Sequence, residues 1–278
     1  MRTLLFGASG LLGKALMPEW TEGTITGLSS RDADIRDAKR VQQVVRDTNP
    51  DWIVLSAAYT DVDGCESNRD LAFAVNRDGA MNVAMAAQEI GARLLFLSSD
   101  YVFDGKKTTP YEIGDPRNPQ GVYGRTKAEA EVKLLSLMPE CCILRTSWLF
   151  GVGGKCFPDS ILKLAANRPA LEVVDDQRGC PTYVVDLARA IPQLCRKNAA
   201  GIVHVTNSGD CTWFDFAQVV VRSAGLATPV RPVSSTQMAR PAPRPAYSVL
   251  SPNSLRALGI EMPSWQDATL RYLQERNG

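Results

Sequence analysis

Short apolar runs alternate with amphipathic stretches through the first half of this chain. The apolar runs predict strands at residues 3–6, 25–28, 52–55, 94–98 and 142–145. Helical spacing of apolar residues predicts helices that begin near Leu11, Ala38, Leu71 and Tyr123. Strands that are apolar along their whole length and alternate with helices are typical of a parallel sheet covered on both faces. The pattern therefore predicts an α/β fold with a doubly wound parallel sheet of the Rossmann type.

The pattern loosens after about Phe150, where a glycine-rich loop follows at residues 151–154. Helices are predicted at residues 159–166, 184–195, 213–224 and 265–275, the third opened by a capping box at Thr212. The proline-rich segment 228–245 is predicted to be mostly extended loop. We expect residues 1–150 to form one domain and residues 151–278 to form mainly a smaller C-terminal lobe, interleaved with the first.

Composition narrows the classes of partner. The 278 residues include 31 basic and 30 acidic side chains, so a net charge of +1 gives no electrostatic case for nucleic acid or an anionic membrane. The N-terminus has no signal-peptide pattern and no run is apolar enough to span a membrane, so we expect a cytoplasmic protein. The seven cysteines form no C-x-x-C pair and His204 is the single histidine, so we expect reduced thiols and no metal site. His204 lies in an apolar run and is predicted to be structural, as are Trp213 and Phe214.

A glycine loop follows the first predicted strand and opens the first helix. Its spacing is G-x-x-G-x-x-G, from Gly7 to Gly13. Glycine permits the tight turn and lets the backbone approach a pyrophosphate, which the helix N-terminus attracts. The loop therefore predicts a dinucleotide site in residues 1–150, and a glycine turn without a ligand is the alternative.

The second predicted strand runs into Ser29, Ser30 and Arg31. Hydroxyls and a guanidinium suit the 2′-phosphate of NADPH better than a free ribose, whereas an acidic residue there would favour NADH. Asp32 is adjacent, so NADPH is favoured and NADH stays open.

The fourth predicted strand ends in Ser98, Ser99 and Asp100, and a helix opens near Tyr123 with Lys127 one turn later. Tyr and Lys at i and i+4 share one helical face. A nearby ammonium is expected to lower the pKa of the phenol, so that Tyr123 can give a proton to the alkoxide formed when hydride reaches a carbonyl. Ser99 is expected to hydrogen-bond to the carbonyl oxygen. These residues predict an NAD(P)H-dependent oxidoreductase.

The chain resembles an extended short-chain dehydrogenase/reductase, and more narrowly the dTDP-4-dehydrorhamnose reductase family. The resemblance rests on motifs spread over nearly the whole chain. They are D-I at 34–35, A-A-Y-T-D-V-D at 57–63, Asn76, S-S-D-Y-V-F-D-G at 98–105, N-P at 118–119, Y-G-R-T-K at 123–127, R-T-S-W at 145–148, D-Q-R-G-C-P-T at 176–182 and R-P-A-Y-S-V-L at 244–250. Ser99 replaces the family's threonine and keeps the hydroxyl.

The resemblance implies NAD(P)H-dependent reduction of the 4-keto group of a nucleotide-linked 6-deoxysugar, giving dTDP-L-rhamnose in the family's main reaction. It implies that the substrate contacts Ser99, Asp100, Tyr101, Trp148 and Arg244. The expected cofactor residues are Gly7, Ser9, Gly10, Leu11, Leu12, Ser29, Ser30, Arg31, Asp34, Ile35, Ala57, Ala58, Tyr59, Asn76, Leu97, Tyr123 and Lys127. A nucleotide-sugar epimerase or dehydratase and a non-catalytic NADP-binding regulatory subunit are the alternatives. Some family members bind magnesium at a dimer contact through acids not matched here, so magnesium and a homodimer stay open.

Overall fold

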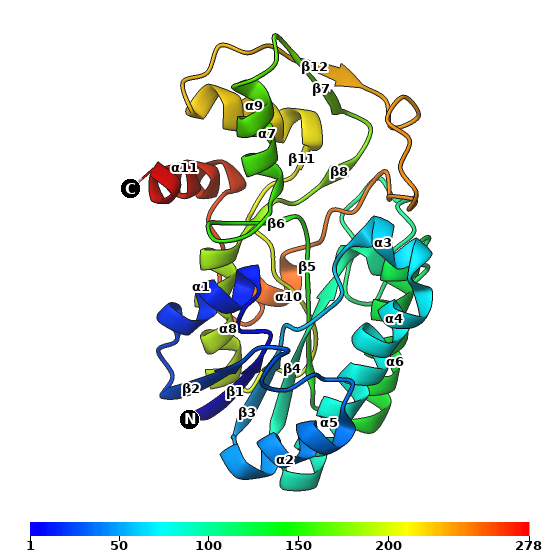
Figure 1. Ribbon diagram of the computed structural model, residues 1–278, viewed down its shortest axis with the longest axis vertical. Helices are drawn as coiled ribbons and strands as arrows, with labels where there is room; N and C mark the ends of the chain where they lie inside the picture. Colours follow the sequence, from blue (N-terminus) through cyan, green and yellow to red (C-terminus); the bar gives the residue numbers. More distant parts are fainter. Residues whose placement is uncertain (278) are drawn as a thin grey trace.

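A six-stranded parallel sheet forms the base of the molecule (Figure 1). The computed structural model describes residues 1–277. Five strands confirm the predicted ones, and all neighbours in the order β2-β1-β3-β4-β5-β10 pair in parallel. The strands are β1 (Arg2–Phe6), β2 (Thr24–Leu28), β3 (Trp52–Leu55), β4 (Arg93–Ser99), β5 (Cys142–Thr146) and β10 (Gly201–His204). The doubly wound α/β fold is therefore confirmed.

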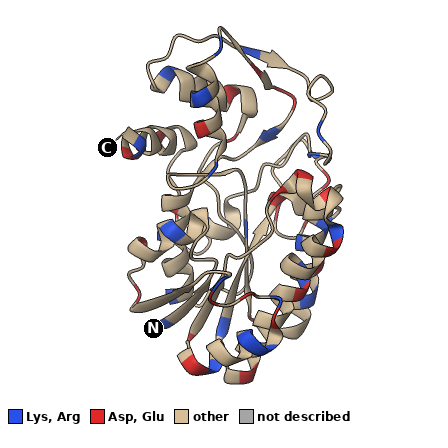
Figure 2. Cartoon of the chain, viewed as in Figure 1, with Lys and Arg blue, Asp and Glu red and all other residues tan. Residues whose placement is uncertain are grey.

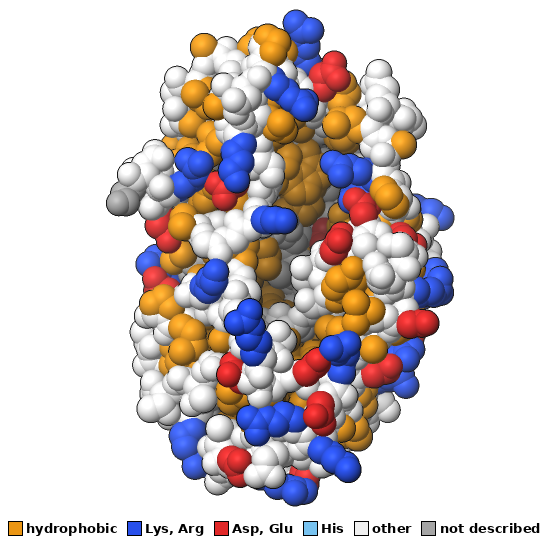
Figure 3. Space-filling view, viewed as in Figure 1, with side chains coloured by type: hydrophobic (Ala, Val, Ile, Leu, Met, Phe, Trp, Pro, Cys, Tyr) orange, Lys and Arg blue, Asp and Glu red, His pale blue; other side chains and the backbone are white. Residues whose placement is uncertain are grey.

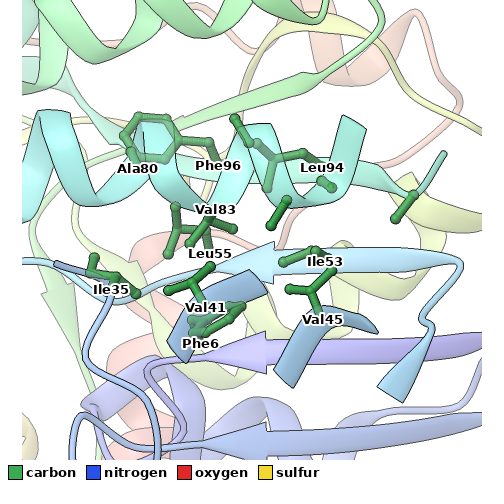
Figure 4. Close-up of a cluster of buried hydrophobic side chains, with 14 of the residues drawn as sticks. Phe6, Ile35, Val41, Val45, Ile53, Leu55, Ala80, Val83, Leu94 and Phe96 are labelled. Atoms are coloured by element: carbon green, nitrogen blue, oxygen red, sulfur yellow. The ribbon is translucent and has the colours of Figure 1, made fainter. Parts of the chain in front are cut away.

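Helices cover both faces of this sheet (Figure 1). On one face lie α1 (Leu11–Glu19) and α8 (Val184–Arg196), and on the other α2 (Ala38–Thr48), α5 (Ala80–Ile90) and α6 (Val122–Leu137). Successive strand residues point to opposite faces, so Phe6 packs toward α2 and α5 while Leu5 packs toward α1 and α8. Figure 4 shows the first of these two cores. Burial of both faces explains why the strands are apolar at every position.

A helix begins at Arg69, close to the start expected near Leu71, but a further helix precedes it. The chain enters α3 (Val62–Ser67), then α4 (Arg69–Phe73), a π-helical turn (Ala74–Gly79) and α5. Asp61 caps α3 by accepting a hydrogen bond from the Gly64 N–H, a signal that the sequence prediction did not use. A π turn is frequent at functional sites, and this one carries Asn76.

The second half builds a smaller lobe above the sheet (Figure 1). Its elements are β6 (Leu149–Phe150), α7 (Phe157–Ala165), β7 (Leu171–Val174), β8 (Arg178–Gly179), β9 (Thr182–Tyr183), β11 (Cys211–Thr212), α9 (Trp213–Ser223), β12 (Val230–Val233) and α11 (Trp265–Asn277). The capping box at Thr212 is present. The segment 228–245, predicted to be mostly loop, contributes β12, which pairs with β7.

Three elements of the second half, α8, β10 and α10 (Asn253–Arg256), pack in the sheet layer instead of the smaller lobe. The division of the chain into two interleaved parts at residue 150 stays a prediction. No helix within residues 1–277 is both long and apolar enough to cross a bilayer. Basic and acidic side chains are interspersed over the outer helices (Figure 2).

Candidate active site

A cavity of about 760 Å³ runs from the glycine loop to the start of α7, at the carboxyl ends of the strands. Figure 3 shows the hollow in this face, with hydrophobic side chains along its upper wall. Most residues predicted for the cofactor line it: Gly7, Ser9, Gly10, Leu11, Leu12, Ser29, Ser30, Asp34, Ile35, Ala57, Ala58, Tyr59, Leu97, Tyr123 and Lys127. Four residues predicted for the substrate line it too: Ser99, Asp100, Tyr101 and Trp148. Arg31, Asn76 and Arg244 are not in its wall.

The glycine loop makes a tight turn between β1 and α1 and packs closely against the backbone that follows β3. Gly7 has φ +99°, and a Cβ there would lie 2.6 Å from the Ala57 backbone nitrogen. Gly10 is the N-cap of α1, and no side chain caps that helix. The first N–H groups of α1 therefore remain available to an anion, which the helix dipole also favours.

At the end of β2, charged side chains pair with each other. Asp32 accepts hydrogen bonds from the Ser29 hydroxyl at 2.6 Å and from the Ser29 N–H at 2.8 Å. Arg36 makes an ion pair with Asp34 at 2.5 Å and lowers the pKa of that carboxyl. Arg36, which the sequence reasoning missed, lines the cavity, whereas Arg31 does not. Arg36 directly follows the D-I motif at residues 34–35, and this position in the sequence could have identified it as a site residue.

At the other end, Tyr123 and Lys127 face the end of β4 from α6. Lys127 is 2% exposed, and its Nζ donates a hydrogen bond to the Leu97 carbonyl oxygen at 2.8 Å. Burial lowers the pKa of Lys127 to about 7, and Glu131 one turn further along α6 opposes that change. The ammonium is thus both desolvated and held against the backbone.

The expected lowering of the phenol pKa by Lys127 is wrong. Burial raises the pKa of Tyr123 well above its ordinary value, the Asp100 charge raises it further, and the Ser99 hydroxyl beside it acts in the opposite direction. The physical reason is that desolvation penalises the phenolate more than any nearby cation favours it. Tyr123 therefore stays protonated, as a proton donor must.

Buried hydroxyl and carboxyl groups surround this phenol. Ser99 Oγ donates a hydrogen bond to Asp100 Oδ1 at 2.9 Å and accepts one from the Tyr101 N–H at 3.2 Å. Burial raises the pKa of Asp100 to about 6. Asp100 Oδ2 and Thr146 Oγ1 are buried without a hydrogen-bond partner in the described chain. Thr146 pairs with Ser99 across β4 and β5 and also lines the cavity, but sequence reasoning did not single it out.

Two tryptophans stack at the far end of the cavity. The Trp148 and Trp213 rings lie 3.5 Å apart, centroid to centroid, and are nearly parallel. Trp148 has φ +48°, and a Cβ on Gly179 would lie 2.6 Å from its ring, so this glycine makes room for the indole. Trp213 was expected in the core; it packs against Phe157 but also lines the cavity beside Trp148.

Two further predicted site residues, Asn76 and Arg244, make hydrogen bonds within the protein. The Asn76 side chain accepts a hydrogen bond from the Tyr59 N–H at 2.8 Å and donates to the Tyr59 carbonyl and the Thr126 hydroxyl. Arg244 makes two hydrogen bonds to Asp63, both 2.9 Å, and one to the Ala242 carbonyl. Neither side chain reaches the cavity in this arrangement.

His204 lies in the sheet, on β10, among buried groups that do not line the cavity. Its Nε2 lies 3.3 Å from Arg145, which is ion-paired with the buried Glu131. Burial lowers the pKa of His204 to about 3, so it is neutral. Within residues 1–277, no group of three or more His, Cys, Asp or Glu residues is placed to hold a metal ion, and all seven cysteines are buried thiols.

Comparison with known proteins places this geometry in a family. The family model for the RmlD substrate binding domain matches residues 1–277. A dTDP-4-dehydrorhamnose reductase of Mycobacterium tuberculosis is 41% identical over 96% of this chain and 90% of its own length. The chain belongs to the dTDP-4-dehydrorhamnose reductase family. It is therefore an oxidoreductase of that type, which confirms the family and the enzyme class predicted from the sequence.

Two further similar proteins extend the comparison. The spore coat polysaccharide biosynthesis protein SpsK of Bacillus subtilis is 39% identical, over 99% of this chain and 98% of its own. A dTDP-4-dehydrorhamnose reductase of Bacillus anthracis, solved in complex with NADP, has a TM-score of 0.96 and 39% identity, and 99% of each chain is covered. The reductase family thus accounts for the whole described fold, including the smaller lobe.

Proposed function

We propose that this chain reduces the 4-keto group of dTDP-6-deoxy-L-lyxo-4-hexulose to give dTDP-L-rhamnose, with NADPH as its preferred reductant. The observation that carries the proposal is the cavity that Ser99, Tyr123 and Lys127 share with the glycine loop. A reductant and a nucleotide sugar must meet in one water-poor space for hydride transfer to occur. The names of the reductases in the family support the choice of sugar nucleotide.

The chain's own residues would handle the proton. The bound dihydronicotinamide supplies the hydride. Tyr123, kept protonated by burial, gives its proton to the sugar oxygen. Lys127, held at the cavity wall by the Leu97 carbonyl, would bind a ribose hydroxyl and favour the phenolate that forms. Ser99 would donate a hydrogen bond to the same oxygen.

For the cofactor, the fit rests on the glycine loop, where Gly7 makes the tight turn and the first N–H groups of α1 have no side-chain cap. Ser29, Ser30 and Arg31 are proposed to receive the 2′-phosphate, and the Arg36 guanidinium lines the cavity at the same end, which Arg31 does not. The NADP in the Bacillus anthracis relative supports this preference.

For the substrate, we propose that Asp100 Oδ2, which has no partner in the described chain, accepts a sugar hydroxyl. Tyr101 lines the wall beside it, and the stacked Trp148 and Trp213 offer an aromatic face to the sugar or base. Arg244 would contact the substrate only after releasing Asp63.

The test is NADPH oxidation by the purified chain with a panel of nucleotide-linked 4-ketosugars. Net oxidation with dTDP-4-dehydrorhamnose, faster than with other sugars or nucleosides, is the expected result. Sugar isomerisation without net oxidation would assign the cavity to an epimerase. If neither reaction occurs but NADPH still binds, the cavity belongs to a regulatory subunit.

A further inference from the structure

The hydrogen-bond pattern of Ser99 conflicts with the role expected of it. A serine hydroxyl has one hydrogen to donate and two lone pairs that accept. In this structure the hydrogen is directed to Asp100 Oδ1, and one lone pair accepts from the Tyr101 N–H. In this arrangement Ser99 has no hydrogen left for a substrate carbonyl.

Asp100 is placed to change this arrangement. It is 2% exposed at the end of β4, and no cation is among the groups that face it. Those groups are Ser99 and Tyr101 beside it, Tyr123 from α6, Cys180 from the turn before β9, and Ser248 from the C-terminal segment. A buried carboxylate without a cation is costly, so both protonation states are accessible near neutral pH, with the pKa raised to about 6.

We propose that Asp100 sets the direction of the Ser99 hydrogen bond. As a carboxylate it holds the Ser99 hydrogen. As a carboxylic acid it donates its own hydrogen to the second lone pair of Ser99 Oγ and so frees the Ser99 hydrogen for the substrate carbonyl oxygen. The proton on Asp100 comes from solvent and returns to it, so the change needs no oxidant or reductant.

Asp100 is a positioning residue in this proposal, which rests on the proposed reductase function. A carboxylic acid kept neutral by an apolar site is a known way to supply a hydrogen-bond donor. The unpartnered Oδ2 remains free to accept a sugar hydroxyl at the same time. The proposal therefore refines the substrate role of Asp100 and does not replace it.

The proposal predicts a pH-dependent benefit from Ser99. Well below pH 6, the parent should exceed Ser99→Ala in kcat by about a hundredfold, the usual effect of one well-placed donor to a developing oxyanion. Above that pH the advantage should shrink by about tenfold for each pH unit, because the carboxylate form of Asp100 withdraws the donor. The comparison uses kcat for NADPH oxidation with a 4-ketosugar nucleotide from about pH 5 to pH 8.

Asp100→Asn tests the coupling, because a carboxamide can donate to Ser99 Oγ at every pH. In the Asp100→Asn background, the effect of Ser99→Ala should be the same at both ends of the pH range, within about twofold. Asp70→Asn is the matched control, since Asp70 is exposed on α4 and should leave the pH dependence as in the parent. A pH-dependent Ser99 effect that persists in Asp100→Asn would overturn the proposal. So would a rise in KM for the sugar with the pH dependence intact, which would reduce Asp100 to a binding residue.

Infrared difference spectroscopy of the ligand-free chain supplies a readout that does not depend on activity. One carboxyl band should titrate near pH 6 in the parent and be missing in Asp100→Asn. In Ser99→Ala it should titrate at higher pH, because the hydrogen bond that favours the carboxylate is gone. If the band titrates at the same pH in Ser99→Ala as in the parent, the proposal is overturned. Failure of the proposed function would look different: no NADPH oxidation with any ketosugar, with this titration unchanged.

Discussion

At the β2 end of the cavity, charged side chains pair with each other in contact with water; at the Tyr123 end, polar side chains are buried. The side chains of Arg36 and Asp34 are 49% and 37% exposed in their ion pair. Lys127 and Ser99 are 2% and 7% exposed, and Asp100 and Thr146 each have a side-chain oxygen without a hydrogen-bond partner among residues 1–277. Water screens the first set, so changes there should alter cofactor choice modestly. Desolvation shifts the pKa values of Asp100, Tyr123 and Lys127 in the second set, so changes there should remove the chemistry.

The largest effect should come from the buried end. Tyr123→Phe removes a proton donor whose contribution exists mainly in the transition state, so kcat should fall by about a hundred- to ten-thousandfold. Folding and NADPH affinity should barely change, because a phenyl ring fills nearly the same volume. Steady-state NADPH oxidation and direct NADPH titration measure the two effects. Tyr247→Phe, outside the cavity wall, is the matched control and should stay within a few-fold of the parent.

Next in size is the aromatic wall. Trp148→Ala should weaken sugar-nucleotide binding by about ten- to a hundredfold, since stacking on an aromatic ring is commonly worth one to a few kcal/mol. Trp148→Phe should restore part of the loss, and NADPH affinity should be the same in all three chains. If calorimetry finds the sugar-nucleotide affinity intact in Trp148→Ala, the indole only packs against its neighbours and does not bind the substrate.

A smaller effect is the uptake of a proton by Lys127 when NADPH binds. Lys127 has a pKa of about 7 in the free chain, so near pH 8 most of it is neutral. The negative charge of NADPH favours the ammonium and raises that pKa, so binding near pH 8 should take up close to one proton. Calorimetry in two buffers of different ionisation enthalpy measures the uptake, which Lys127→Met should abolish. Equal uptake in parent and variant would place the titrating group elsewhere.

The smallest effect belongs to the exposed end. Arg31→Ala should weaken NADPH binding by a few-fold and leave NADH binding nearly untouched, because a solvent-exposed charge pair is usually worth 1 kcal/mol or less. Arg36→Ala is the comparison, since Arg36 lines the cavity but is already paired with Asp34. If only Arg36→Ala loses NADPH affinity, Arg36 and not Arg31 binds the 2′-phosphate. If both variants lose equal affinity for NADPH and NADH, neither arginine binds the 2′-phosphate.

The sequence predicted what depends on local pattern. The five strands are apolar because both sheet faces are buried, and the glycine loop is visible because its spacing is fixed by a turn. Features made by distant segments were missed. β10 joins the sheet from residue 201 onward, and β12 is a strand because β7 lies beside it.

The same distinction holds in the site. Ser99, Tyr123 and Lys127 carry a recognisable spacing, whereas Thr146 matters because β4 and β5 align it with Ser99. Trp213 reaches the cavity through its stack on Trp148. The direction of the Tyr123 pKa was wrong because spacing places the ammonium nearby but cannot measure how deeply the phenol is buried.

The account assigns catalysis to the Tyr123 end of the cavity and cofactor choice to the β2 end, and a double-variant experiment tests this most directly. Single-turnover rates of NADPH oxidation and dissociation constants for NADPH are measured for Tyr123→Phe, Arg31→Ala and the double variant. The account predicts that the double variant shows the rate loss of Tyr123→Phe together with the affinity loss of Arg31→Ala, because independent sites add in free energy. A Tyr123→Phe chain that turns over within a few-fold of the parent, or that loses NADPH affinity in place of rate, would contradict it.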